Sequence, residues 1–123
     1  MTRKEIQYKI NQLTKQLNNY TSEKNSYSNS LGYAKKLVSS LNTSLQYLNT
    51  TNDNLKSSFT INGKTADGGK VEETKNEVNA VIREVNNSVI PDINSNIKTL
   101  TNKINNINSQ LYTLRRQLQN ATE

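Results

Sequence analysis

Few residues in this 123-residue chain have the types and spacing that chemistry requires. The run Gly63-Lys64-Thr65 matches the end of a phosphate-binding loop, but the upstream glycine and the preceding strand of such a loop are missing. Asp67-Gly68 resembles part of a calcium loop, yet the other acidic ligands are not there. The chain has no Cys and no His, so thiolate chemistry and the usual zinc ligands are lacking. We therefore expect no enzymatic activity, no metal and no cofactor.

The charged residues favour a solvated surface. The chain carries 16 basic and 10 acidic residues, for a net charge of +6, and the basic ones are spread along its length. A nucleic-acid site would concentrate them on one face, so we expect no nucleic-acid partner. No apolar segment follows Met1 and no stretch reaches the length of a membrane span, which predicts no Sec signal peptide and no stable membrane insertion.

An apolar stripe between Ile6 and Phe59 indicates the first of the elements that must position any functional residue. Apolar residues recur there at alternating steps of four and three, and only Lys24 and Asn52 interrupt them. An average spacing of 3.5 residues is typical of a helix that packs against another helix. We expect a continuous helix from about residue 3 to about residue 56. Gly32 lies within it, and is interpreted as tolerated, as a site of close helix approach or as a bend.

Residues 57–70 predict the reversal of the chain, because they contain three of its four glycines. The dipeptide Asn62-Gly63 favours a tight turn, so Phe59–Ile61 can pair with Lys64–Thr65 in a short hairpin. Phe59 and Ile61 are large apolar residues beside this turn. They either plug the end of the molecule or anchor a partner, and the two roles are compatible.

A second helix is expected from about residue 71 to about residue 120. Its stripe is predicted to pass through Val78, Val81, Val85, Val89, Ile93 and Ile97. The phase of the stripe changes between residues 85 and 97, and Pro91 lies in that interval. Proline lacks a backbone donor and clashes with the preceding turn, so a kink or break is expected at residues 89–92. Alternatively, Pro91 opens a new helix.

These elements predict an all-α fold in which residues 1–123 form one antiparallel, coiled-coil-like helical hairpin. Two helices touch along a single line, which leaves apolar residues beside that line exposed; we expect this of Tyr33, Leu37, Tyr47, Ile82 and Ile90. A further helical molecule would cover them, so assembly into a helical bundle is expected. The residues predicted to bind a partner are Leu31, Val38, Leu41, Leu45, Leu48, Leu55, Phe59, Ile61, Gly63, Ile97, Leu100, Ile104, Ile107, Leu111 and Leu114.

In its two stripes and its Phe59–Gly63 turn, the chain resembles the WXG100-like proteins of type VII secretion, and within them the small α-helical partners of LXG-domain toxins (the YwqH-like family). The resemblance implies a protein that binds the helical N-terminal domain of an LXG toxin as targeting factor or chaperone, in a complex that has room for a second small helical partner. It implies a cytoplasmic location before export and secretion through the type VII system afterwards. The family's Trp-x-Gly turn has no Trp here, and its export pattern would place an acid where Arg116 stands.

Two other functions fit the same pattern. Prefoldin-type general chaperones also join two long helices through a β-hairpin, although residues 57–70 are short for their strand pairs. A homo-oligomeric coiled-coil scaffold, such as a homodimer of the chain alone, would also cover the exposed flanks.

Overall fold

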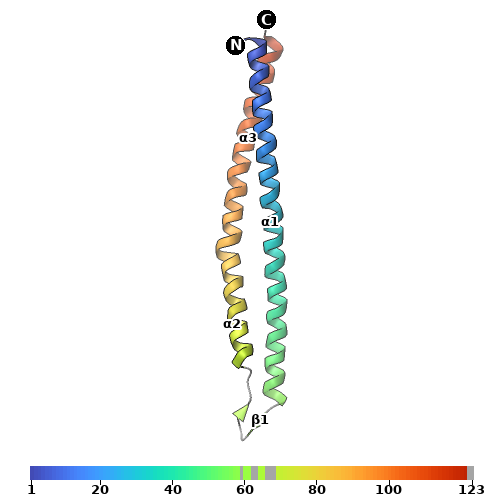
Figure 1. Cartoon of the computed structure of the whole chain (residues 1–123), viewed down its shortest axis with the longest axis vertical. Coiled ribbons are helices and arrows are strands. Elements are labelled where there is room, and N and C mark those ends of the chain that lie inside the picture. The colour runs from blue at the N-terminus through green and yellow to red at the C-terminus, as the bar shows by residue number, and fades with distance from the viewer. Residues whose placement is uncertain (59, 62–63, 66–68, 122–123) are drawn as a thin grey trace. The chain divides into compact units, whose positions relative to one another are not determined.

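The computed structural model describes residues 1–58, 60–61, 64–65 and 69–121, with side-chain environments for residues 1–54 and 71–121. The fold is an all-α helical hairpin, as the sequence predicts (Figure 1). Its elements are α1 (Arg3–Ser58), β1 (Thr60–Ile61), β2 (Lys64–Thr65), α2 (Gly69–Glu84), the π-helical segment η1 (Val85–Val89) and α3 (Ile90–Asn120). The predicted helix boundaries therefore agree with the observed ones to within about two residues.

Helix α1 begins with a capping box formed by Thr2 and Glu5. The Glu5 backbone N–H donates to Thr2 Oγ1, and the Thr2 backbone N–H donates to Glu5 Oε2, each at 3.1 Å. These two bonds satisfy donors that a helix start leaves without intrahelical partners. From there α1 continues without a break through Gly32, where an added Cβ would meet nothing within 4 Å. Of the interpretations of Gly32, tolerance fits and close helix approach does not, and the helix shows no break at this residue.

The predicted strand pairing is confirmed between α1 and α2. Strand β1 pairs antiparallel with β2, with Thr60 opposite Thr65 and Ile61 opposite Lys64. Phe59 and the Asn62-Gly63 turn lie outside the described residues. The pair follows directly from α1 and precedes α2, so it marks the point at which the chain reverses.

The chain divides into two compact units. Unit 1 contains residues 1–30 and 93–123, and unit 2 contains residues 31–92. Each unit pairs one part of α1 with the part of the returning chain that it contains (Figure 1). Each therefore has its own line of contact between two helical segments, which we call its seam.

The seam of unit 1 is a closed apolar core. Its core cluster has the buried members Ile6, Ile10, Ile107, Leu111 and Leu114, with Leu13, Leu17, Tyr20, Leu118 and Ala121 packed against them, and Leu100 is buried in the same unit. Two polar contacts show that the helical segments are antiparallel. Arg3 Nη1 donates to the Leu118 carbonyl oxygen at 2.8 Å, and the Lys103 ammonium lies 5.2 Å from the centroid of the Tyr20 ring. The cation stabilises the pair through the electron-rich face of the ring.

The seam of unit 2 buries fewer side chains. Its buried members are Ala34, Val85 and the polar Asn52, which is 4% exposed. Asn52 Nδ2 donates to Glu72 Oε2 at 3.4 Å, and the Glu72 carboxylate also pairs with Lys75 Nζ at 3.4 Å. The interruption of the first stripe at Asn52 thus has a hydrogen-bonding role, because a buried amide without a partner would cost stability.

The seam of the returning chain differs from its predicted path. It passes through Val78, Ile82, Val85, Ile90 and Ile93, which are buried or half-buried. The prediction was wrong for Val81 and Val89, which are 45% and 38% exposed. It was also wrong for Ile82 and Ile90, which were expected to be exposed flank residues.

The π-helical segment η1 is the physical reason for the part of this path that follows Val85. The Ile90 backbone N–H donates to the Val85 carbonyl, five residues back, so this turn contains one residue more than an α-helical turn. The seam consequently steps by five from Val85 to Ile90 and by threes and fours on either side. Backbone angles at Ile90 are helical, and α3 continues through Pro91 without an interruption. The expected irregularity near Pro91 is therefore a π turn that precedes the proline, and the break expected at residues 89–92 is not observed.

Candidate partner-binding surface

Six of the predicted partner-binding residues belong to the seam of unit 1. Leu100, Ile107, Leu111 and Leu114 are buried, and Leu111 is only 1% exposed; Ile97 and Ile104 are half-buried. Packing inside the unit already covers most of this apolar area, which is therefore not available to another molecule without opening the seam.

The predicted residues of unit 2 are less covered. Leu31, Val38, Leu41, Leu45 and Leu48 are all half-buried, at alternating steps that follow the predicted stripe. The environments of the Leu55, Phe59, Ile61 and Gly63 positions lie outside the described residues, so the anchoring role of the turn stays a prediction. Along α1, a lone pair of helices leaves the unit 2 seam partly open to solvent.

Among the side chains of unit 2 that the structure describes, five large apolar ones are exposed, and we call them the apolar strip. They are Tyr33 (71%), Leu37 (46%), Tyr47 (75%), Val81 (45%) and Val89 (38%). The expected exposure of Tyr33, Leu37 and Tyr47 is confirmed. Sequence reasoning missed Val81 and Val89, although one signal was present: each directly precedes a seam isoleucine, as Leu37 directly precedes a seam valine.

This shared position places the aliphatic members of the strip on one side of the seam. Leu37 precedes Val38 on α1, and Val81 precedes Ile82 on α2. In an antiparallel helix pair, residues that directly precede equivalent seam positions face the same side, because the two-fold relation between the helices preserves that side. Tyr33 lies one turn from Leu37, and Tyr47 lies two heptads from Tyr33, so both tyrosines border the same side.

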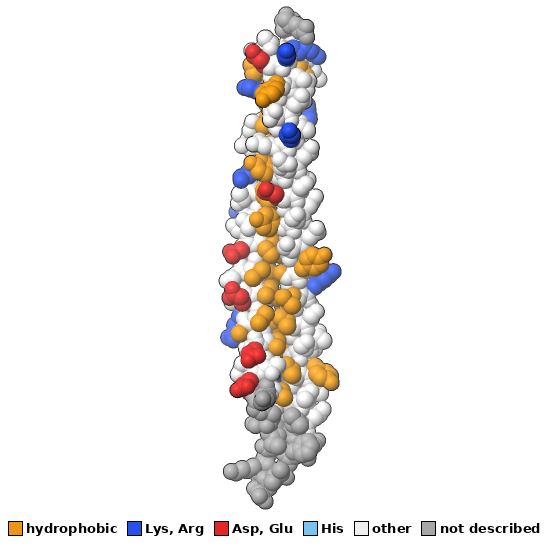
Figure 2. Space-filling model, viewed as in Figure 1, with side chains coloured by type: hydrophobic (Ala, Val, Ile, Leu, Met, Phe, Trp, Pro, Cys, Tyr) orange, Lys and Arg blue, Asp and Glu red, His pale blue; other side chains and the backbone are white. Residues whose placement is uncertain are grey.

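Figure 2 shows this face, on which hydrophobic side chains gather along the unit 2 seam between α1 and α2. The opposite side of that seam is polar. It is made of the residues that directly follow every second seam position, which are Lys35, Asn42, Asn49, Glu72, Asn79 and Asn86. On the apolar side, the positions equivalent to Leu37 and Val81 also include Ser44, Thr51 and Thr74, which are polar. The strip is therefore concentrated toward η1. Unit 2 therefore has one apolar and one polar flank.

Unit 1 has no such apolar flank. Its positions equivalent to Leu37 and Val81 are occupied by polar or charged residues. They are Lys9, Gln16, Glu23, Asn96, Lys103, Gln110 and Gln117. Exposed apolar side chains do occur in unit 1, at Met1, Tyr8 and Tyr112, but none of them directly precedes a seam position. The Arg116 guanidinium carbon sits 5.9 Å from the Tyr112 ring centroid, which partly covers that ring. The apolar strip is thus a property of unit 2.

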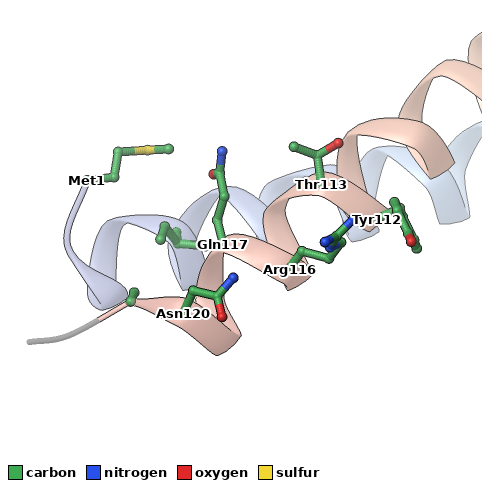
Figure 3. A pocket seen from close by; sticks show the side chains of 8 residues that line it. Met1, Tyr112, Thr113, Arg116, Gln117 and Asn120 are labelled. Carbon is green, nitrogen blue, oxygen red and sulfur yellow. The ribbon is translucent and has the colours of Figure 1, made fainter.

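The concavities of unit 1 do not combine groups suited to chemistry. One, of about 490 Å³, lies where the ends of the chain meet and is lined by Met1, Tyr112, Thr113, Arg116, Gln117 and Asn120 among others (Figure 3). Its described lining residues combine one side-chain cation with amides and an apolar floor at Ile6, and none of these residues is acidic. A second concavity, of about 630 Å³, is lined mainly by amide, hydroxyl and aliphatic side chains. Neither pairs a nucleophile with a base.

In the part of the chain that the structure describes, no three acidic side chains lie close enough together to hold a metal ion. In the same residues, no helix has the length and apolar character needed to cross a bilayer.

Comparison of the chain with protein-family models, with curated proteins and with solved structures finds no match.

Proposed function

We propose that this chain is a non-enzymatic helical partner that binds the helical N-terminal domain of an LXG toxin. In this role it acts as targeting factor or chaperone for export of the toxin through type VII secretion. The chain then starts in the cytoplasm and leaves with its toxin, and a second small helical protein can complete the complex. The proposal rests on the resemblance in stripes and turn and on the apolar strip of unit 2.

The apolar strip is the observation that carries the proposal. The chain is otherwise polar, with a mean hydropathy of −0.85 and 32% hydrophobic residues. In such a chain, five large apolar side chains exposed in one unit beside a half-buried seam are a costly feature unless something covers them. A helix or helical hairpin packed against α1 and α2 would cover them and complete a bundle.

Co-expression with an LXG toxin domain encoded beside this gene tests the proposal. We expect the two chains to elute together in size-exclusion chromatography, with a mass by light scattering equal to their sum. An unrelated helical protein of similar charge serves as the control. Separate elution at micromolar concentration of both chains would contradict the proposal.

A prefoldin-like general chaperone is the second candidate, favoured by the β1–β2 pair at the chain reversal. The two functions differ in their clients, because a holdase binds many unfolded proteins and a dedicated partner binds one folded helical domain. If the chain suppresses aggregation of several unrelated unfolded proteins at equimolar ratio, the general chaperone is supported. A lack of suppression, together with co-elution with the toxin domain, supports the dedicated partner.

A further inference from the structure

We propose that the apolar strip of unit 2 docks an amphipathic helix of a different protein, with lysine or arginine along the edge of that helix that lies over α2. This inference rests on the proposed function, since it specifies which face binds and what the partner must present there. The first step is one-sidedness. Leu37, Val81 and Val89 make one flank of the seam apolar, while the other flank is made of asparagines, Lys35 and Glu72.

The second step is the charge that borders the strip. Glu77 lies four residues before Val81, and Glu84 three residues after it, so both flank the valine on the surface of α2. Glu73 continues this row one turn earlier, and all three side chains are exposed. Acidic side chains line the α2 edge of the face in Figure 2. A helix docked on the strip would place one of its own edges against this row, and a basic edge is complementary there.

The third step concerns a second copy of the chain as occupant. If two copies packed by the strip with their helices antiparallel, the glutamates of α2 would meet the same glutamates of the other copy. If the helices were parallel, the glutamates would meet α1, which between residues 31 and 54 has only Lys35 and Lys36 as basic residues. Lys35 lies on the polar flank of the seam, which leaves Lys36, three residues after Tyr33, as one basic side chain of this stretch to face three glutamates. A second copy thus offers a poor match to the acidic row, and a different protein with a basic-edged helix fits better.

The strip also suits a helix in size. Tyr33 and Tyr47 are fourteen residues apart and occupy the same angular position on α1, so the strip extends over two heptads. The tyrosines supply large, rigid contact surfaces at its border, and the aliphatic side chains supply its centre. This is the arrangement that receives side chains spaced by three and four residues on one helix.

The test uses the full-length chain and two designed amphipathic helical peptides of about four heptads, which share a leucine stripe and differ only in having lysine or glutamate at its edges. We expect the lysine-edged peptide to bind at least about tenfold more tightly at low salt, by fluorescence anisotropy, and the difference to shrink as salt screens the edge contacts. Equal binding of both peptides, or preference for the glutamate-edged one, would overturn the inference. This measurement does not depend on the toxin.

Variants assign the binding to the strip. In the double variant Leu37→Gln/Val81→Gln, we expect at least a tenfold loss of binding to the lysine-edged peptide with unchanged helicity by circular dichroism, because both side chains are already exposed. In Glu77→Lys/Glu84→Lys, we expect the preference between the two peptides to reverse. Asn42→Gln/Asn86→Gln, on the polar flank, is the matched control and should bind as the original chain does. A control that loses binding as strongly as the strip variant would overturn the assignment of the face.

Two outcomes separate this inference from the proposed function. If the chain binds the lysine-edged peptide through the strip but not the toxin domain, the docking face stands and the toxin partner is wrong. If the toxin domain binds equally to the original chain and to Leu37→Gln/Val81→Gln, the function stands and the docking face is wrong. Sedimentation equilibrium of the chain alone tests whether a second copy occupies the strip. A dimer that dissociates in the variant Leu37→Gln/Val81→Gln would show a second copy on the strip and overturn the inference.

Discussion

At the scale of single residues, Asn52 and Gly32 show how two departures from a regular apolar helix have different causes. Asn52 stands where the stripe calls for an apolar side chain, and it is buried with its amide donating to Glu72. A polar residue in a helix seam lowers stability but favours one register, because only that register satisfies its hydrogen bonds. Gly32 has no neighbour that an added methyl group would meet. Its cost to the helix is therefore not offset by packing in unit 2.

Gly32→Ala is expected to stabilise the protein by about 0.5–1 kcal/mol, because alanine restricts the unfolded chain and suits a helix interior better than glycine. Thermal unfolding followed by circular dichroism should show a melting temperature higher by a few degrees. The reverse change Ala34→Gly, two residues further on at a buried position, is the control and should lower the melting temperature. A loss of stability in Gly32→Ala would mean that the glycine allows a bend or a close helix contact.

At the scale of elements, the π-helical segment keeps the seam of the returning chain in phase. The apolar residues before Val85 and after Ile90 follow regular steps of three and four, but the two series are offset by one residue. An extra residue in one turn absorbs this offset without breaking the helix. The segment also leaves Val89 exposed beside Ile90, so it contributes one member of the apolar strip.

Deletion of Asn87, which is exposed in η1, should convert the segment into a regular α-helix. The seam would then step by four from Val85 to the present Ile90, so we expect unchanged helicity and an unchanged or higher melting temperature. Deletion of Asn106, exposed in the regular part of α3, is the matched control. It would rotate Ile107 and Leu111 by about 100° out of the seam and cost several kcal/mol. Equal destabilisation by the two deletions would contradict this role of the π turn.

At the scale of the whole molecule, the two units differ in charge and in burial. Unit 1 contains nine basic and three acidic residues, whereas unit 2 contains seven of each, so the net charge of +6 belongs to unit 1. Unit 1 also holds the cluster of fully buried aliphatic side chains. Unit 2 holds the apolar strip and a half-buried stripe along α1. The buried apolar cluster and the exposed apolar strip therefore lie in different parts of the chain.

Native-state hydrogen exchange should reveal this division. Amides of Ile107 and Leu111 are expected to exchange most slowly, because opening them exposes the unit 1 core, while amides around Leu41 and Ile82 should exchange faster. Adding the lysine-edged helical peptide should slow exchange in unit 2 and leave unit 1 unchanged. Uniform protection along the free chain, or protection of unit 1 by the peptide, would be inconsistent with this division.

The sequence alone determined the helices, the reversal and most of the seam, because the spacing of apolar residues along a helix is a local property that survives packing. It also indicated the irregularity near Pro91 and the exposure of Tyr33, Leu37 and Tyr47. The tertiary structure decided which of the two residues Val81 and Ile82 lies in the seam, since that depends on the angular position of the helix against α1. It likewise placed Glu72 at Asn52, and it brought Leu37 and Val81 to the same flank, because antiparallel pairing joins residues that the sequence keeps more than forty positions apart.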